Sequence, residues 1–221
     1  MWKSSVSVAL LVLTAFLLWG CGSRPEFVAK DEPWRKDQEM ACLKSGYVRE
    51  NRYLMARASL GSGVCGAIRP FEMTATANGS VQLNPPAMMV CDMVPAVEHW
   101  VNAIVQPAAR AHLGQPIVEL RVAASYSCRP MNNQSGGKLS EHGHANAIDI
   151  AAFRTADGRW ITVKEGWSSW SRDSRFLKSV HQGGCPVFTT VLGPNANSNH
   201  RDHFHFDLAR HGRDGHHRVC Q

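Results

Sequence analysis

The chain has 221 residues, 44% of them hydrophobic, and a formal net charge of +6 at pH 7. This length and composition allow one domain with a sizeable core. The sequence contains no repeat or low-complexity block. It also contains no nucleic-acid-binding motif, so we expect no nucleic-acid partner. The basic charge suits an anionic partner such as a cell wall, or an ordinary solvated surface.

An apolar run from Val6 to Trp19 follows Met1-Trp2-Lys3 at the start of the chain. The run is shorter than the roughly 20 residues of a membrane-spanning helix, so it predicts a secretory signal peptide over residues 1–20. Its end, Leu18-Trp19-Gly20-Cys21, resembles the cleavage site of bacterial lipoproteins. The resemblance implies that Cys21 is lipidated and holds the protein on a membrane. Gly22 after the cysteine implies the outer membrane, on the periplasmic side of the bacterial cell envelope. An uncleaved anchor or an ordinary signal peptide is the alternative.

The segment from residue 21 to residue 37 is polar and contains Pro25 and Pro33. It predicts a lipid-anchored tether, which leads into a single domain over residues 38–221. We expect this domain to be a monomer.

Seven cysteines are an odd number for an exported chain, and setting Cys21 aside leaves six. An oxidising periplasm would form three disulfides from them, although six cysteines allow about 15 pairings. No C-x-x-C occurs, which argues against metal binding by these thiols. The six are Cys42, Cys65, Cys91, Cys128, Cys185 and Cys220.

Apolar periodicity predicts the main elements. Apolar side chains recur at helical spacing over residues 92–112, where Pro107 would kink or end the helix. Before it, residues 42–89 are punctuated by glycine and proline and predict loops and short strands. The remaining predictions are strands over 117–124, 147–153 and 187–192, a hairpin turn at Asp157-Gly158 into the run 160–163, a helix over 171–181, and a solvated tail over 209–221.

Two polar motifs coincide with predicted strands. The first, S-E-H-G-H-A-N-A-I-D, ends at Asp149, which alternation turns away from Ile148 and Ile150 toward a cleft. The second, H-R-D-H-F-H, begins at His200, and alternation puts His203, His205 and Asp207 on one face with Phe204 and Phe206 behind them. Zinc binds imidazole nitrogen and carboxylate oxygen, and a catalytic zinc keeps one position open. The two motifs therefore predict a zinc site between two strands.

These motifs also carry a family resemblance. The S-x-H-x(6)-D pattern followed by H-x-H resembles zinc peptidases that cut D-alanyl peptides of bacterial cell walls. The segments S-E-H-x-x-A-N-A-x-D, A-D-G-R, V-L-G-P-N and H-R-D-H-F-H-x-D resemble more closely the bacterial extensin-like C-terminal family, over roughly residues 42–220. Ala145 stands where such peptidases often have glycine. The ligands we expect are His142, Asp149 and His205, the last because the second histidine of H-x-H binds metal in the resembling enzymes.

Three residues are candidates for the general base of such an enzyme. Strand alternation favours His203, which shares a face with His205; His200 would then bind substrate or shuttle protons. Asp202 is the third candidate, because alternation turns it toward the other face. Arg129 occupies the place of an upstream arginine that binds substrate or polarises the carbonyl in the resembling enzymes, and a salt-bridged surface arginine is its alternative.

The resemblance implies an α+β fold, with a small antiparallel sheet and a long helix in a disulfide-stabilised zinc peptidase-like domain. The function it implies is Zn2+-dependent hydrolysis of peptidoglycan peptides, by endopeptidase or D-alanyl carboxypeptidase activity. Two alternatives stay open: a non-catalytic cell-wall-binding lipoprotein with a structural zinc, and a periplasmic metal carrier. An open zinc position would favour the enzyme, and a fourth protein ligand would favour the binding module.

Overall fold

A computed structural model describes residues 27–29, 32–61 and 63–221. Its strands are β1 (Leu54–Ala56), β2 (Phe71–Ala75), β3 (Gln82–Met89), β4 (Ile117–Ala124), β5 (Ala147–Thr155), β6 (Trp160–Thr162), β7 (Thr190–Leu192), β8 (Phe204–Asp207) and β9 (Val219–Cys220). Its helices are α1 (Trp34–Ser45), α2 (Met93–Trp100), α3 (Gln106–Leu113), α4 (Val163–Gly166) and α5 (Arg172–Gly184), with shorter turns η1 (Val101–Val105), η2 (Met131–Asn133), η3 (Glu141–His144) and η4 (Ser198–His200).

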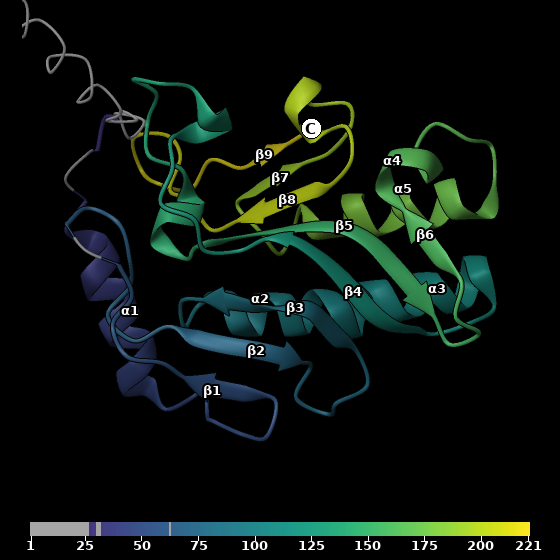
Figure 1. Ribbon diagram of the computed structural model, residues 1–221, viewed down its shortest axis with the longest axis horizontal. Helices are drawn as coiled ribbons and strands as arrows, with labels where there is room; N and C mark the ends of the chain where they lie inside the picture. Colours follow the sequence, from purple (N-terminus) through teal and green to yellow (C-terminus); the bar gives the residue numbers. More distant parts are fainter. Residues whose placement is uncertain (1–26, 30–31, 62) are drawn as a thin grey trace, which may run out of the picture.

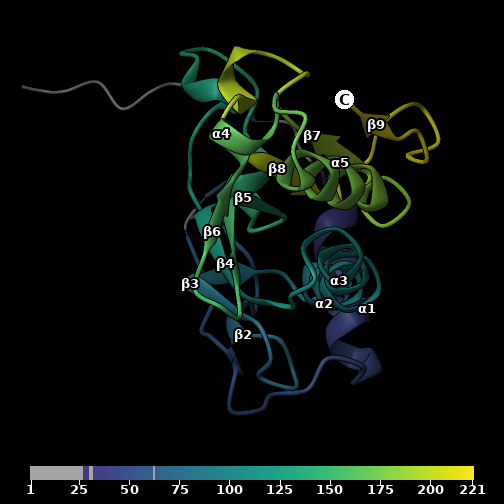
Figure 2. The same ribbon diagram turned by 90° about the vertical axis from the view of Figure 1, so that its right-hand side faces the viewer.

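The described strands form one mixed sheet in the order β1-β2-β3-β4-β5-β8-β7-β9, with β6 paired to β5. Helices α2, α3 and α5 gather on one side of it, as Figures 1 and 2 show. The mixed α and β content and the three disulfides agree with expectation, but the prediction of a small antiparallel sheet is wrong. Strands β3 and β4 are parallel, and so are β7 and β9. Strands β3 and β4 can run parallel because α2, η1 and α3 form the crossover that connects them.

The predicted helix over residues 92–112 is present as the continuous run α2–η1–α3. The middle part, η1, has π-type turns, and Pro107 lies directly after it in the first turn of α3. Proline has no N–H to give to the preceding turn, so the chain changes its hydrogen-bond spacing there without breaking. Trp100 from this run is buried against Phe153 of β5 and Phe206 of β8, which fixes the run on the sheet.

Several local predictions are confirmed. Strand β4 covers the expected residues, β5 and β6 form the expected hairpin, and the helix predicted over 171–181 is present as α5, which runs on to Gly184. Strand β7 is shorter than predicted, because Phe188 N–H bonds back to Gly184 and turns the chain before Thr190.

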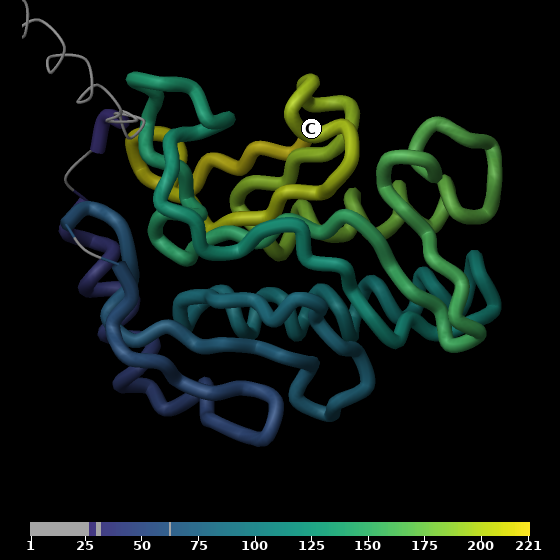
Figure 3. Tube along the Cα trace, viewed as in Figure 1, coloured from purple at the N-terminus to yellow at the C-terminus, as the bar shows by residue number. Residues whose placement is uncertain are grey.

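The tail is largely exposed, as expected, and its end also forms β9 beside β7, as Figures 1 and 3 show. Its His211 bonds Thr190, with 2.7 Å between Nε2 and Oγ1.

The expected tether is also partly folded. Helix α1 begins at Trp34, and Val28 pairs with Lys138 in an isolated bridge, so the domain starts earlier than residue 38. The predicted signal peptide and Cys21 lie outside the described residues. None of the helices in the described ranges has the length and apolar character to cross a membrane.

Three disulfides join the six cysteines, as expected. Cys42–Cys91 ties α1 to the start of α2, Cys65–Cys128 ties the loop before β2 to the segment after β4, and Cys185–Cys220 ties the end of α5 to β9.

Candidate metal centre

Two adjacent strands place the second and third predicted ligands side by side. Strands β5 and β8 are antiparallel, and Asp149 stands directly opposite His205. On either side of Asp149, Ile148 and Ile150 are buried in the apolar core. Because side chains alternate along a strand, Asp149 and His205 point to the sheet face opposite that core.

The first predicted ligand comes from the 3-10 turn η3. Ser140 begins this turn, and its hydroxyl accepts the N–H of His142. Ala145 ends the turn with φ of 52°, a left-handed backbone that favours glycine. Alanine at this position, in place of the glycine common in the resembling peptidases, therefore adds some backbone strain, and the turn is still formed.

The three side chains converge. His142 Nε2 lies 3.1 Å from Asp149 Oδ2, and His205 Nδ1 lies 2.9 Å from Asp149 Oδ1. The two imidazole nitrogens are 3.2 Å apart, and all three residues are buried. Donor atoms bound to a tetrahedral zinc at 2.0–2.1 Å stand about 3.4 Å from one another. The spacing and the donor types therefore fit zinc, after an outward shift of a few tenths of an ångström.

Groups behind the ligands fix which nitrogen faces the centre. His142 Nδ1 donates to the carbonyl of Ser125 at 2.5 Å, which turns Nε2 toward Asp149 and the cluster. His205 Nε2 donates to Asp207 Oδ2 at 2.9 Å, which turns Nδ1 toward Asp149 Oδ1. A carbonyl or carboxylate behind each histidine is the usual support for a metal ligand.

Charge coupling is strong inside the cluster. Burial opposes ionisation of Asp149, but hydrogen bonds from His142 and His205 hold its pKa below the ordinary value. Burial also opposes a charge on His205, yet Asp149 and Asp207 raise its pKa to about 10. Two carboxylates thus flank His205, and a cation at this point balances their charge.

The predicted base candidates lie at the rim of the cluster. His203 Nε2 is 3.7 Å from Asp149 Oδ2, while its Nδ1 donates to Asp202 Oδ1 at 2.8 Å. The Asp202 carboxylate itself is exposed and faces His203, on the side away from the cluster. His200 is buried beside His203 and His205, and its burial, with the charge of His205 next, lowers its pKa to about 4.

Arg129 is also brought to the site, with 4.0 Å between a guanidinium nitrogen and Asp149 Oδ2. His144, also from the first motif, is not part of this cluster. It lines a separate cavity of about 710 Å³ beside residues 59–61 and 63–68, where burial lowers its pKa.

A clamp from α1, missed by sequence reasoning, supports the first motif. The Arg35 guanidinium makes two hydrogen bonds with Glu141, at 2.6 and 2.8 Å, and Asn146 donates to the same carboxylate at 2.6 Å. Trp34 is covered by Arg35 at 4.4 Å and by Arg210 at 4.3 Å. Glu141 and Asn146 lie at either end of the turn that carries His142, so this clamp joins η3 to α1.

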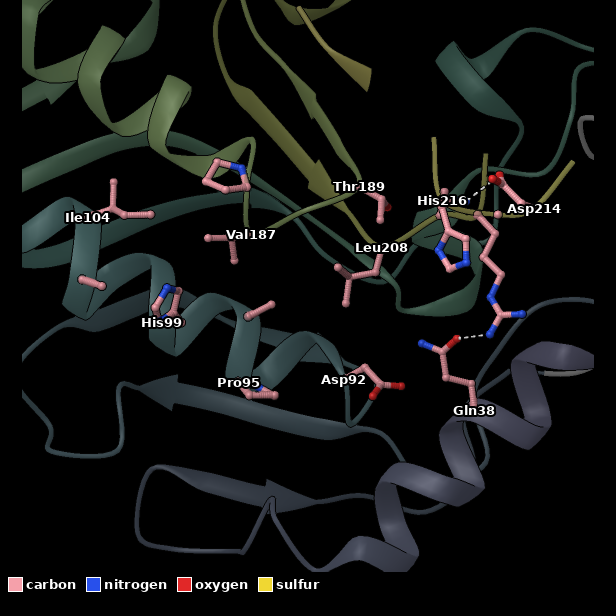
Figure 4. Close-up of a pocket in the computed structure, with 16 residues that line it drawn as sticks. Gln38, Asp92, Pro95, His99, Ile104, Val187, Thr189, Leu208, Asp214 and His216 are labelled. Carbon is pink, nitrogen blue, oxygen red and sulfur yellow. Dashed lines mark hydrogen bonds between the residues drawn. The ribbon is translucent and has the colours of Figure 1, made fainter. Parts of the chain in front are cut away.

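A larger cavity, of about 970 Å³, lies on the helical side of the molecule (Figure 4). Asp92, His99, Ile104 and Leu208 are among its lining residues, and none of the cluster ligands is. The candidate metal centre therefore lies on the sheet face opposite the core, outside both of these cavities.

One of three comparisons with known proteins found a match. A family model described as Extensin-like protein C-terminus matches residues 40–221, a range that contains the cluster and all six paired cysteines. No curated protein and no solved structure matches the chain at a significant level.

Proposed function

The chain belongs to the extensin-like protein C-terminus family, and we propose that it is a zinc-dependent hydrolase of bacterial cell-wall peptides. The observation that carries the proposal is the buried His142–Asp149–His205 cluster with its free ligand atoms facing one another. The likeness of the S-x-H-x(6)-D and H-x-H patterns to zinc D-alanyl peptidases supports the choice of substrate. A zinc ion held there would supply Lewis acidity toward the scissile carbonyl and toward water.

His203 is the proposed general base. Because its Nδ1 donates to Asp202, its Nε2 carries a lone pair and faces the cluster. It is therefore placed to take a proton from the attacking water and to deliver it to the leaving amine. Asp202 holds the imidazole in this tautomer and stabilises its protonated form.

Arg129 is the proposed oxyanion partner. Its guanidinium approaches the cluster from the segment after β4 and keeps its charge at any pH at which a protein is folded. Fixed donors of this kind stabilise the charge that develops on a carbonyl oxygen during hydrolysis. His200, neutral at pH 7, is left for contact with the substrate.

The direct test is digestion of purified muropeptides by the domain, with the products identified by mass. Zinc-loaded protein should release cross-linked peptides or terminal D-alanine, and a chelator should stop the reaction. Cleavage that continues unchanged after complete removal of metal would contradict the proposal.

The binding-module alternative rests on a specific distance as well. His203 Nε2 stands near enough to Asp149 that a small rotation could bring it in as a fourth ligand and close the site. The absorption spectrum of the cobalt-substituted protein separates the two functions. If the site has an open position with an exchangeable water, adding azide or another anion should change the spectrum. If four protein ligands close the site, the spectrum should stay the same.

A further inference from the structure

An arginine on the same sheet face as the metal cluster is held in an unusual way. Arg121 on β4 is exposed, whereas its neighbours Leu120 and Val122 are buried in the core. It therefore points to the sheet face opposite the core, which is also the face of Asp149. Its Cα is paired with that of Ala152 on β5.

The Arg121 side chain lies across β5. Its guanidinium carbon is 4.3 Å from the centre of the Trp160 ring on β6, the strand on the far side of β5. Ala152 stands between the two strands, and a side chain of this size leaves room for the arginine to cross. Stacking on an indole holds the guanidinium plane and leaves its N–H edge available for hydrogen bonds.

Other arginines nearby have carboxylate partners. Arg154 bonds Glu119 at 3.2 Å, and Arg159 bonds both oxygens of Asp173. Among the residues that the structure describes, Arg121 makes neither an ion pair nor a side-chain hydrogen bond. It is thus an oriented cation with its donors free, and an oriented guanidinium edge matches a carboxylate.

The distance to the metal cluster is set by the register. Asp149 and Ala152 are three residues apart on β5, which is at most about 10 Å along a strand, because the β4–β5 register shifts between them. An extended peptide advances by nearly the same amount in three residues. From this geometry we infer that Arg121 and Trp160 form a subsite for a free carboxylate of the substrate peptide, about three residues from the bond that is cleaved. The inference rests on the proposed hydrolase function and adds an acidic group to the substrate class.

The test uses pairs of synthetic D-alanyl peptides that differ only in one carboxyl group, free or amidated, three residues to either side of the scissile bond. For the parent protein, KM should be about tenfold lower for the free acid in one of these pairs, which is the worth of a charge-assisted contact. Arg121→Gln should remove this preference and leave kcat for the amidated peptide unchanged, because the lost contact is ground-state binding. Trp160→Leu should weaken the preference, since it removes the surface that orients the guanidinium.

Arg110→Gln is the matched control, since Arg110 is an exposed arginine on α3 at the other side of the sheet. It should keep the parent's preference. Equal KM values for free and amidated peptides in the parent, or an unchanged preference in Arg121→Gln, would overturn the inference. If the parent cleaves none of the peptides, the hydrolase function fails, and calorimetric binding of the same pairs still decides the subsite: tighter binding of the free acid that depends on Arg121 supports it, and equal binding refutes it.

Discussion

At the residue scale, the clustering of His142, Asp149 and His205 could be predicted from the sequence, because each of them sits in a short local pattern. A histidine seven residues before an aspartate, and an H-x-H in a strand, leave a signature in the side chains themselves. Ser125 leaves none, because it supports His142 through its backbone carbonyl. Asp207 was placed on the correct face by alternation, but its bond to His205 could be known only once the strands were built.

The first prediction separates the proposed base from the residue that orients it. His203→Ala should keep zinc and lower kcat by about 10²–10⁴-fold, the usual worth of proton transfer. Asp202→Asn should lower kcat less, because the imidazole stays in place and loses only its carboxylate partner. Stopped-time assays on muropeptides, with the metal content of each variant, measure both effects. A fully active His203→Ala with an inactive, zinc-loaded Asp202→Asn would transfer the role of base to Asp202.

At the element scale, α1 shows where periodicity fails. Its sequence is polar, and the one residue that it fully buries is Glu39, which accepts the backbone N–H groups of Ile68 and Arg69. An amphipathic pattern cannot reveal a helix that is held by charge, a disulfide and hydrogen bonds. For this reason the expected tether ran into a folded element.

The Arg35–Glu141 contact gives the second prediction. Both side chains are largely buried, at 16% and 15% exposure, so Arg35→Met should leave Glu141 without its main partner. We expect the free energy of unfolding to fall by about 3 kcal/mol. Arg57→Met is a control, since Arg57 forms a more exposed pair with Glu72, and it should cost less than about 1 kcal/mol. Urea titrations of the two variants compare them, and equal losses would show that α1 is not held in this way.

The third prediction concerns α5 and pH. His181 is buried against Trp167 and Phe204, its Nε2 donates to the Gln221 carbonyl, and burial lowers its pKa. The unfolded chain therefore binds a proton more readily than the folded one, so this residue lowers stability as pH falls below about 6.5.

The corresponding experiment follows thermal unfolding between pH 7.5 and pH 5. The parent should lose more stability over this interval than His181→Gln, which cannot take up the proton. Parallel curves for the two proteins would exclude a titrating His181 in this window.

At the scale of the whole molecule, the sheet order could not be predicted from local patterns. Strands β4, β5 and β6 were recognised because alternation and a turn signal lie within a few residues. The parallel pairing of β3 with β4, and of β9 with β7, depends on partners that are distant in sequence. Such pairings are decided by how the crossover helix packs on the core and by the Cys185–Cys220 disulfide, neither of which a short window of sequence contains.

The fold nevertheless explains why two motifs about sixty residues apart meet. The core aromatic residues of β8, Phe204 and Phe206, face the helices, so His205 between them is forced onto the open face beside Asp149. The meeting of Asp149 and His205 is therefore a direct consequence of strand alternation in two neighbouring strands.

The central claim is that His142, Asp149 and His205 together hold one zinc ion, and metal stoichiometry tests it most directly. The purified parent protein should bind one zinc per chain after dialysis, and His142→Ala, Asp149→Ala and His205→Ala should each lose most of it, because each removes one of three protein ligands. His216→Ala, which changes an exposed histidine of the tail, should bind zinc like the parent. Full zinc occupancy in all three ligand variants, or loss of zinc only in His216→Ala, would contradict the account.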